Sequence, residues 1–137
     1  MSEIRRLIVI AASLVTSAGC FAASKPDLEN GKTTFTSMCG VCHSVEKNAL
    51  PTPGPGLLGI MGRKAAADAE FPSYSAALKS SGIKWNKKTL DKFLANPGVM
   101  VQGTTMPMMI ADDKSRADVV AYLGTLKAPK ADKKKKK

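Results

Sequence analysis

The chain has 137 residues and a formal net charge of +10, and most of the excess charge lies at one end. Residues 24–126 hold twelve Lys and Arg against nine Asp and Glu, whereas residues 127–137 hold seven Lys and one Asp. This length predicts one domain. The single histidine, His43, excludes any metal site built from several imidazoles.

The first 22 residues have the composition of an export signal. Arg5 and Arg6 form a short basic region, followed by an apolar run over residues 7–15 and by small residues up to Ala23. The run is too short to span a bilayer comfortably. Cleavage after Ala22 would leave a mature chain of 115 residues. We therefore expect an exported protein, and nucleic acid is not an expected partner.

Because of Cys20, two other ways of processing this segment remain open, which makes three in all. Residues 17–20 are similar to the lipoprotein signal in which the cysteine is acylated, although leucine is usual where Ser17 stands. The third possibility is that the segment is retained as an uncleaved anchor. All three predict a periplasmic protein, either soluble or tethered to the outer side of the cytoplasmic membrane.

Residues 28–38 carry apolar or small side chains at spacings of three and four, which predicts the first helix. Directly after it, Cys39, Cys42 and His43 form the C-x-x-C-H motif that is typical of covalent haem attachment. The two thiols can add to the two vinyl groups of the porphyrin, and the adjacent imidazole then lies against the iron. We expect His43 to be the proximal iron ligand.

The same cysteine pair also fits a structural disulfide, a thioredoxin-type redox pair or half of a zinc site. Zinc would need further Cys or His ligands, and none follow His43. A thioredoxin-type pair normally belongs to a chain of alternating strands and helices, which this sequence does not show. A disulfide alone gives His43 no role, so haem attachment is the favoured interpretation.

Further helices follow the motif. Residues 73–79 predict a short helix, and residues 86–95 predict a helix that Asn86 can cap and that Pro97 ends. Residues 112–126 predict the third main helix, with acidic side chains at its positive end. There is no convincing strand pattern and no internal repeat, so we expect an all-α domain over residues 23–127, wrapped around one haem.

The segment 96–107 offers the second axial ligand. Pro and Gly punctuate it, and it shows neither helical periodicity nor strand alternation, which predicts an ordered loop. Met106 is the ligand that we expect, and a thioether ligand raises the reduction potential of the iron. Met100, Met108 and Met109 compete for this role, because methionine in such a stretch is more often core filler. With both axial positions occupied, electron transfer is favoured over catalysis.

Together these features resemble the class I cytochrome c family, in its bacterial, mitochondrial-like monohaem form, over residues 28–126. The resemblance implies three main helices plus short helices around one covalently attached haem c. It also implies that the N-terminal helix crosses the C-terminal helix, with Gly31 and Phe35 meeting Tyr122 and Leu123.

The resemblance further implies which residues surround the haem. The carbonyl of Pro55 would accept a hydrogen bond from His43 and thereby orient the imidazole ring. Arg63, Tyr74 and Trp85 would surround the haem propionates with hydrogen-bond donors, since buried carboxylates are costly unless they are paired.

The resemblance also selects Met106, because residues 103–106 are similar to the methionine segment of the family and Met106 follows His43 by 63 positions. It implies a monomeric single-electron carrier, not an enzyme, whose partners are redox proteins such as an oxidase, a quinol-oxidising complex or a dehydrogenase. The alternative is a haem enzyme or a gas-binding or sensing haem protein with a labile sixth ligand. That alternative usually needs a distal base, and no second histidine is available.

Two features bear on partner binding, and the first is a departure from the family. Gly98, Val99 and Thr105 occupy positions where mitochondrial-type members commonly carry lysines, so docking at the haem edge should be more apolar and less salt-dependent. The tail over residues 128–137 should be disordered, because it has no apolar surface to bury and its charges repel one another. It is either a solvated extension or an electrostatic tether to anionic lipid or an acidic protein.

Overall fold

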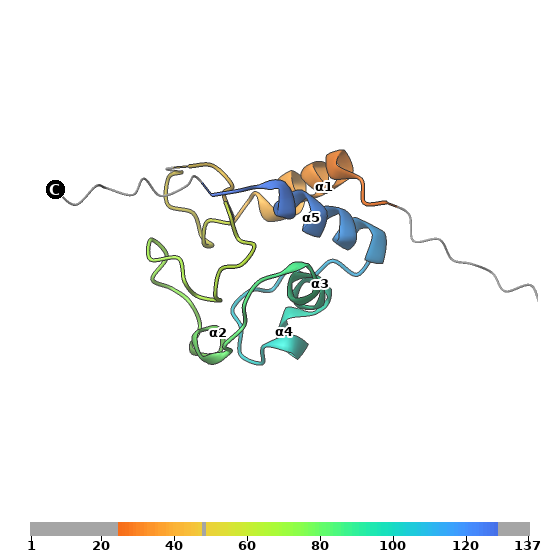
Figure 1. Cartoon of the computed structure of the whole chain (residues 1–137). Helices are drawn as coiled ribbons and strands as arrows, with labels where there is room; N and C mark the ends of the chain where they lie inside the picture. Colours follow the sequence, from red (N-terminus) through yellow and green to blue (C-terminus); the bar gives the residue numbers. More distant parts are fainter. Residues whose placement is uncertain (1–24, 48, 129–137) are drawn as a thin grey trace, which may run out of the picture.

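The computed structural model describes residues 25–47 and 49–128; the predicted export signal and all but the first residue of the predicted tail lie outside this range. The described helices are α1 (Leu28–Thr34), the π-helical turn η1 (Phe35–Cys39), α2 (Ala76–Ser80), α3 (Lys87–Ala95), α4 (Pro97–Met100) and α5 (Asp113–Thr125) (Figure 1). Among these residues the only strand-like pairing is an isolated bridge between Lys64 and Lys84. The predicted all-α fold class is confirmed.

The helix predicted over residues 28–38 is present, but its last turn is widened. Asp27 caps α1 by accepting hydrogen bonds from the backbone N–H groups of Glu29 and Asn30. At the other end, the N–H of Gly40 donates to the carbonyl of Phe35 at 2.8 Å, which is the five-residue spacing of a π-helix. Helical backbone therefore runs without a break into the haem-attachment motif.

The helices α1 and α5 lie side by side (Figure 1) and cross at Gly31. A Cβ atom on Gly31 would lie 2.2 Å from the carbonyl oxygen of Asp118 and 3.0 Å from the Cβ of Tyr122, so only glycine permits this approach. One turn along, the rings of Phe35 and Tyr122 pack with centroids 5.7 Å apart. The helix crossing that the family resemblance implied is present.

A buried carboxylate joins the two helices at this crossing. The Asp118 side chain has no exposed surface and accepts hydrogen bonds from the backbone N–H of Asp27 at 2.8 Å, the amide of Asn30 at 2.7 Å and the ammonium group of Lys114 at 2.7 Å. The hydrogen bonds from Lys114 and Asn30 lower the pKa of Asp118 from 3.8 to about 2. The carboxylate is therefore ionised at neutral pH and stabilised in that form.

The helices predicted over residues 86–95 and 112–126 are confirmed as α3 and α5, with their cap residues just outside them. The Asn86 side chain accepts a hydrogen bond from the N–H of Thr89, and the backbone N–H of Asn86 donates one to the Thr89 hydroxyl oxygen, which together form a capping box. Asp112 accepts from the N–H of Ser115 in the same way. These caps explain why each helix begins one residue later than the predicted range.

The prediction of a helix-free loop over residues 96–107 is wrong at its start, where α4 forms. The Asn96 side chain accepts a hydrogen bond from the N–H of Val99 at 3.0 Å, and Pro97 stands at the first helical position, where its missing N–H costs nothing.

The short helix predicted over residues 73–79 is displaced to Ala76–Ser80, because Ser75 acts as its N-cap.

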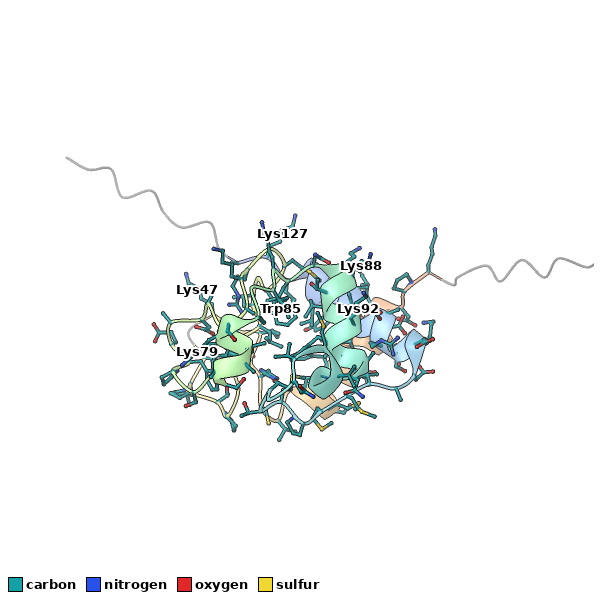
Figure 2. The ribbon with its side chains drawn as sticks, turned by 90° about the horizontal axis from the view of Figure 1, so that it is seen from below. Lys47, Lys79, Trp85, Lys88, Lys92 and Lys127 are labelled. Carbon is teal, nitrogen blue, oxygen red and sulfur yellow. The ribbon has the colours of Figure 1, made fainter. Side chains whose placement is uncertain are left out.

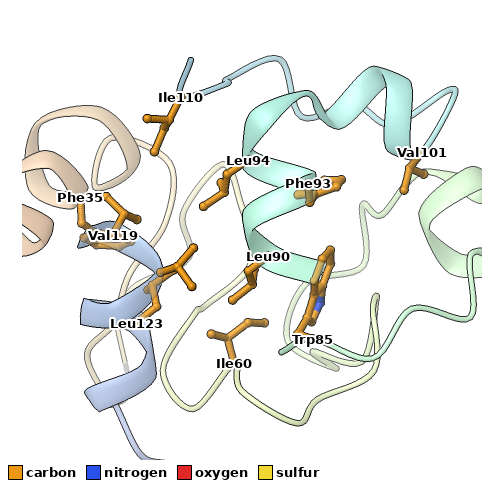
Figure 3. Packing of buried hydrophobic residues seen from close by; sticks show 11 residues of the cluster. Phe35, Ile60, Trp85, Leu90, Phe93, Leu94, Val101, Ile110, Val119 and Leu123 are labelled. Atoms are coloured by element: carbon orange, nitrogen blue, oxygen red, sulfur yellow. The ribbon is translucent and has the colours of Figure 1, made fainter. Parts of the chain in front are cut away.

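The core lies on both sides of α3, and one part of it fills the space between α3 and α5 (Figure 3). Figure 3 shows Leu90 and Leu94 of α3 pointing toward Leu123 of α5, and all three side chains are buried. On the other side of α3, the rings of Trp85 and Phe93 pack edge to face with centroids 5.1 Å apart. These buried side chains also line a cavity.

We predict that Asp118→Asn lowers the free energy of unfolding at neutral pH. A carboxylate whose pKa falls on folding stabilises the fold above its ordinary pKa of 3.8, and this contribution is lost as the pH falls toward 2. The stability of the wild type should therefore decline over this pH range more steeply than that of the variant. Denaturant unfolding followed by circular dichroism measures both effects.

The matched control is Asp113→Asn, which removes a carboxylate that is 91% exposed from the same helix. Its ion-pair partner Arg116 also pairs with Asp91 and donates to the Ile110 carbonyl, so this variant should lose much less stability than Asp118→Asn and keep the acid response of the wild type. Equal losses in the two variants would contradict the role of Asp118.

Candidate haem-binding site

A cavity of about 360 Å³ brings together all eight residues that the sequence predicted for the site: Cys39, Cys42, His43, Pro55, Arg63, Tyr74, Trp85 and Met106. Its volume lies in the range of small-molecule and cofactor sites, roughly 300–1,000 Å³. Apolar side chains form much of the remaining wall, among them Phe35, Leu57, Ile60, Leu78, Leu90 and Phe93.

The attachment motif forms a tight turn at the end of η1. The N–H groups of Cys42 and His43 both donate to the carbonyl of Cys39, at 3.0 and 2.8 Å, and all three side chains line the cavity. Neither cysteine forms a disulfide within the described residues. Burial, together with the neighbouring Cys42, raises the pKa of the Cys39 thiol. Thioredoxin-type redox pairs show the opposite shift, so this alternative is disfavoured.

The loop after the motif holds the imidazole ring of His43 in one orientation. Its Nδ1 lies 2.8 Å from the carbonyl oxygen of Pro55. A carbonyl oxygen only accepts, so this hydrogen bond requires the proton on Nδ1 and leaves the lone pair on Nε2. The backbone of Gly54 packs against the ring, where a Cβ atom would lie 2.6 Å from Cε1. The Nε2 atom is therefore the one available to a metal.

Two of the four competing methionines line the cavity, namely Met106 and Met108. Met106 is half-buried and packs against the core, whereas Met108 is 41% exposed. Met100 also packs against the core but does not line the cavity, and Met109 is exposed. Of the two methionines that reach the cavity, Met106 is the more buried.

The polar residues expected around the propionates lie on neighbouring segments. Arg63 donates through Nη2 to the carbonyl of Gly56, and its own carbonyl accepts from the backbone N–H of Trp85 at 2.8 Å. The ring of Tyr74 packs edge to face on Phe71 with centroids 4.9 Å apart. Burial raises the pKa of Tyr74, so its hydroxyl keeps its proton at neutral pH and can donate a hydrogen bond.

This set of donors fits a c-type haem. Two thiols, an imidazole with a free Nε2 and a thioether surround an apolar cavity, as haem attachment and axial ligation require. Arg63 and Tyr74 supply the polar groups that buried propionates need. A zinc site fits poorly, because no group of three or more His, Cys, Asp or Glu side chains among residues 25–47 and 49–128 is placed to hold a metal.

One polar contact at the site was not predicted. The Oδ2 atom of Asp68 accepts a hydrogen bond from the N–H of Gly56 at 3.0 Å, and its Oδ1 accepts from the N–H of Glu70 at 3.2 Å. Asp68 stands alone among alanines and belongs to no motif. Only the folded loop brings it next to Gly56.

Comparisons with known proteins agree with this site. The family profile described as cytochrome c matches residues 28–127. The chain is 39% identical to cytochrome c2 from Rhodomicrobium vannielii over 121 residues, which cover 88% of this chain and 94% of that protein. It is 44% identical to cytochrome c from Tetrahymena pyriformis over 98 residues, which cover 71% and 86%. Among solved structures, cytochrome cH from Methylobacterium extorquens is 40% identical with a TM-score of 0.64, covering 72% of this chain and 98% of that one.

We predict that Gly54→Ala lowers the free energy of unfolding of the haem-loaded protein by about 1–3 kcal/mol, because the added methyl group overpacks the His43 ring. The control is Gly98→Ala, whose Cβ would meet only the Asn96 Oδ1 atom, at an ordinary 3.7 Å. Denaturant unfolding of the three proteins measures the difference. If both variants matched the wild type, the packing of Gly54 on the ring would have no energetic role.

Proposed function

The chain belongs to the cytochrome c family, and on this basis we propose that it carries single electrons between respiratory or dehydrogenase partners in the periplasm. Its cofactor is covalently bound haem c, and the sequence holds a single C-x-x-C-H motif. One observation carries the proposal: a single cavity is lined by two thiols, one imidazole and a thioether. An electron carrier of this kind exchanges electrons with other redox proteins.

We assign Cys39 and Cys42 to covalent attachment, and His43 and Met106 to the two axial positions of the iron. When bound, haem supplies an iron that alternates between the ferrous and ferric states. The hydrogen bond from His43 to Pro55 keeps the imidazole in the tautomer that can bind through Nε2. With both axial positions held by protein side chains, no position is left for a substrate, which supports electron transfer over catalysis.

Arg63, Tyr74 and Trp85 are the residues that we assign to the propionates. Each lines the cavity, and a guanidinium, a protonated phenol and an indole N–H are all donors suited to a carboxylate. The apolar wall that includes the buried Phe93 disfavours the extra positive charge of ferric iron. Together with the thioether, this wall favours a high reduction potential.

We predict that Met106→Ala abolishes the weak far-red charge-transfer absorption of the oxidised protein and lets carbon monoxide bind rapidly to the reduced protein. The matched control is Met108→Ala, which removes the other competing methionine that lines the cavity and should leave both properties unchanged. Loss of the band in Met108→Ala alone would reverse the ligand assignment. A wild-type protein that lacks the band and binds carbon monoxide rapidly would favour the haem enzyme or gas-binding alternative.

The proposed location rests on the export-signal composition of residues 1–22, which lie outside the described residues. Within the described part of the chain, no helix is both long enough and apolar enough to cross a membrane. The mass of the purified protein distinguishes cleavage after Ala22 from acylation of Cys20 and from retention of the whole segment.

We propose that the lysine-rich tail attracts redox partners over long range and that an apolar rim makes the contact. Val41, between the two attachment cysteines, is 72% exposed, and Val99 is 81% exposed, so each of these apolar side chains is accessible to a partner. Figure 2 shows Lys79 of α2 on one side of Trp85 and Lys88 and Lys92 of α3 on the other side. These three lysines are exposed and add positive charge outside the tail.

We predict that deleting residues 130–137, which removes six Lys and one Asp, flattens the dependence of the electron-transfer rate on ionic strength. The rate constant should fall at low salt, where long-range attraction acts, and stay unchanged at high salt, where it is screened. Stopped-flow measurement with a purified oxidase or dehydrogenase tests this. The variant Val99→Ser should lower the rate at all salt concentrations without changing its dependence on ionic strength. If the deletion left that dependence unaltered, the tail would not be the source of the long-range attraction.

A further inference from the structure

The amide group between Pro55 and Gly56 is hydrogen-bonded at both ends. Its carbonyl oxygen accepts from Nδ1 of His43 at 2.8 Å, and its N–H donates to Oδ2 of Asp68 at 3.0 Å. The carbonyl of residue 55 and the N–H of residue 56 belong to one planar, resonance-stabilised unit. A continuous chain of hydrogen bonds therefore links the Asp68 carboxylate to the imidazole of His43.

The two hydrogen bonds reinforce each other. A negative charge at the N–H end of an amide draws the N–H proton toward it and shifts electron density toward the carbonyl oxygen, which becomes a stronger acceptor. Hydrogen bonds to an ionised group are also about twice as strong as those between neutral groups. The carboxylate of Asp68 therefore strengthens the hydrogen bond that His43 donates at the far end of the amide.

Neighbouring contacts hold this arrangement in place. Asp68 is half-buried, and its second oxygen accepts from the N–H of Glu70 at 3.2 Å, so the carboxylate is anchored through both oxygens. Arg63 lies nearby and donates to the carbonyl of Gly56. None of the ion pairs formed among the described residues involves Asp68, so its negative charge is not neutralised by a paired cation there.

We propose that Asp68 is a positioning residue for the iron site, acting on His43 through the Pro55–Gly56 amide and lowering the reduction potential. A stronger hydrogen bond from Nδ1 makes the imidazole a better electron donor through Nε2, and this favours ferric over ferrous iron. The inference rests on the proposed role of His43 as the proximal ligand. Asp68 would therefore lower the reduction potential, whereas the thioether and the apolar wall would raise it.

Three variants separate the charge from the hydrogen bond. Asp68→Asn keeps an oxygen that can accept from Gly56 but removes the charge, and Asp68→Ala removes both. Glu70→Gln removes one negative charge two residues away, from an exposed side chain that does not touch the amide. The measurements are the reduction potential of the haem-loaded protein, by equilibrium titration, and the proton chemical shift of His43 Nδ1–H in the reduced protein, by NMR.

Both Asp68 variants should have a higher reduction potential than the wild type, with the larger rise in Asp68→Ala, and their Nδ1–H resonance should move upfield as the hydrogen bond weakens. Glu70→Gln should leave the resonance in place and change the potential less. Equal rises in Asp68→Asn and Glu70→Gln with an unmoved resonance would indicate a through-space charge effect and overturn the proposal, as would an unchanged potential in Asp68→Asn.

If Asp68→Ala does not fold, Asp68→Asn and Glu70→Gln still decide between these outcomes. Failure of the proposed function has a different signature, because it affects the wild type itself. A wild-type protein without the far-red absorption band would overturn the assignment of the axial ligands, and this inference with it.

Discussion

The crossing of α1 and α5 at Gly31 is the contact on which the position of the haem-attachment segment depends. The two helix backbones approach so closely that a Cβ atom on Gly31 would overlap the backbone of Asp118. The buried Asp118 carboxylate then joins the start of α1 to α5. Since η1 continues α1 without a break, this crossing sets where Cys39 enters the cavity wall.

In the proposed iron site, the polar and apolar parts would act on the reduction potential in opposite directions. The thioether of Met106 and a wall of buried apolar side chains would favour ferrous iron, because they offer little stabilisation to the additional charge of the ferric state. The loop after the attachment motif would oppose them, because its Pro55 carbonyl accepts the hydrogen bond of His43 and the Asp68 carboxylate accepts one from the same amide. A loop without regular secondary structure therefore holds the ring and also adjusts its electron density.

Local signals account for the parts of the fold that were predicted correctly, and weak or competing local signals account for the errors. Asn86 and Asp112 have side chains that cap helices, and α3 and α5 are long enough to show a periodic apolar face. In contrast, α4 has four residues and α2 has five, too few for a periodic pattern to appear. Pro97 follows the end of α3 and also occupies the first position of α4. Because proline was interpreted only as the end of a helix, α4 was not predicted. The π-helical turn that begins at Phe35 has no characteristic sequence pattern.

By itself, the sequence determined the all-α fold class and the covalently bound haem, because the C-x-x-C-H motif and the main helices depend on spacings of a few residues. The tertiary structure decided which methionines reach the cavity and that Asp68 lies against Gly56. These contacts join segments that are far apart along the chain or belong to irregular loops, where the path of the backbone follows from packing against the rest of the fold. No local spacing encodes such a path, so a lone aspartate among alanines carries no signal until the loop has closed.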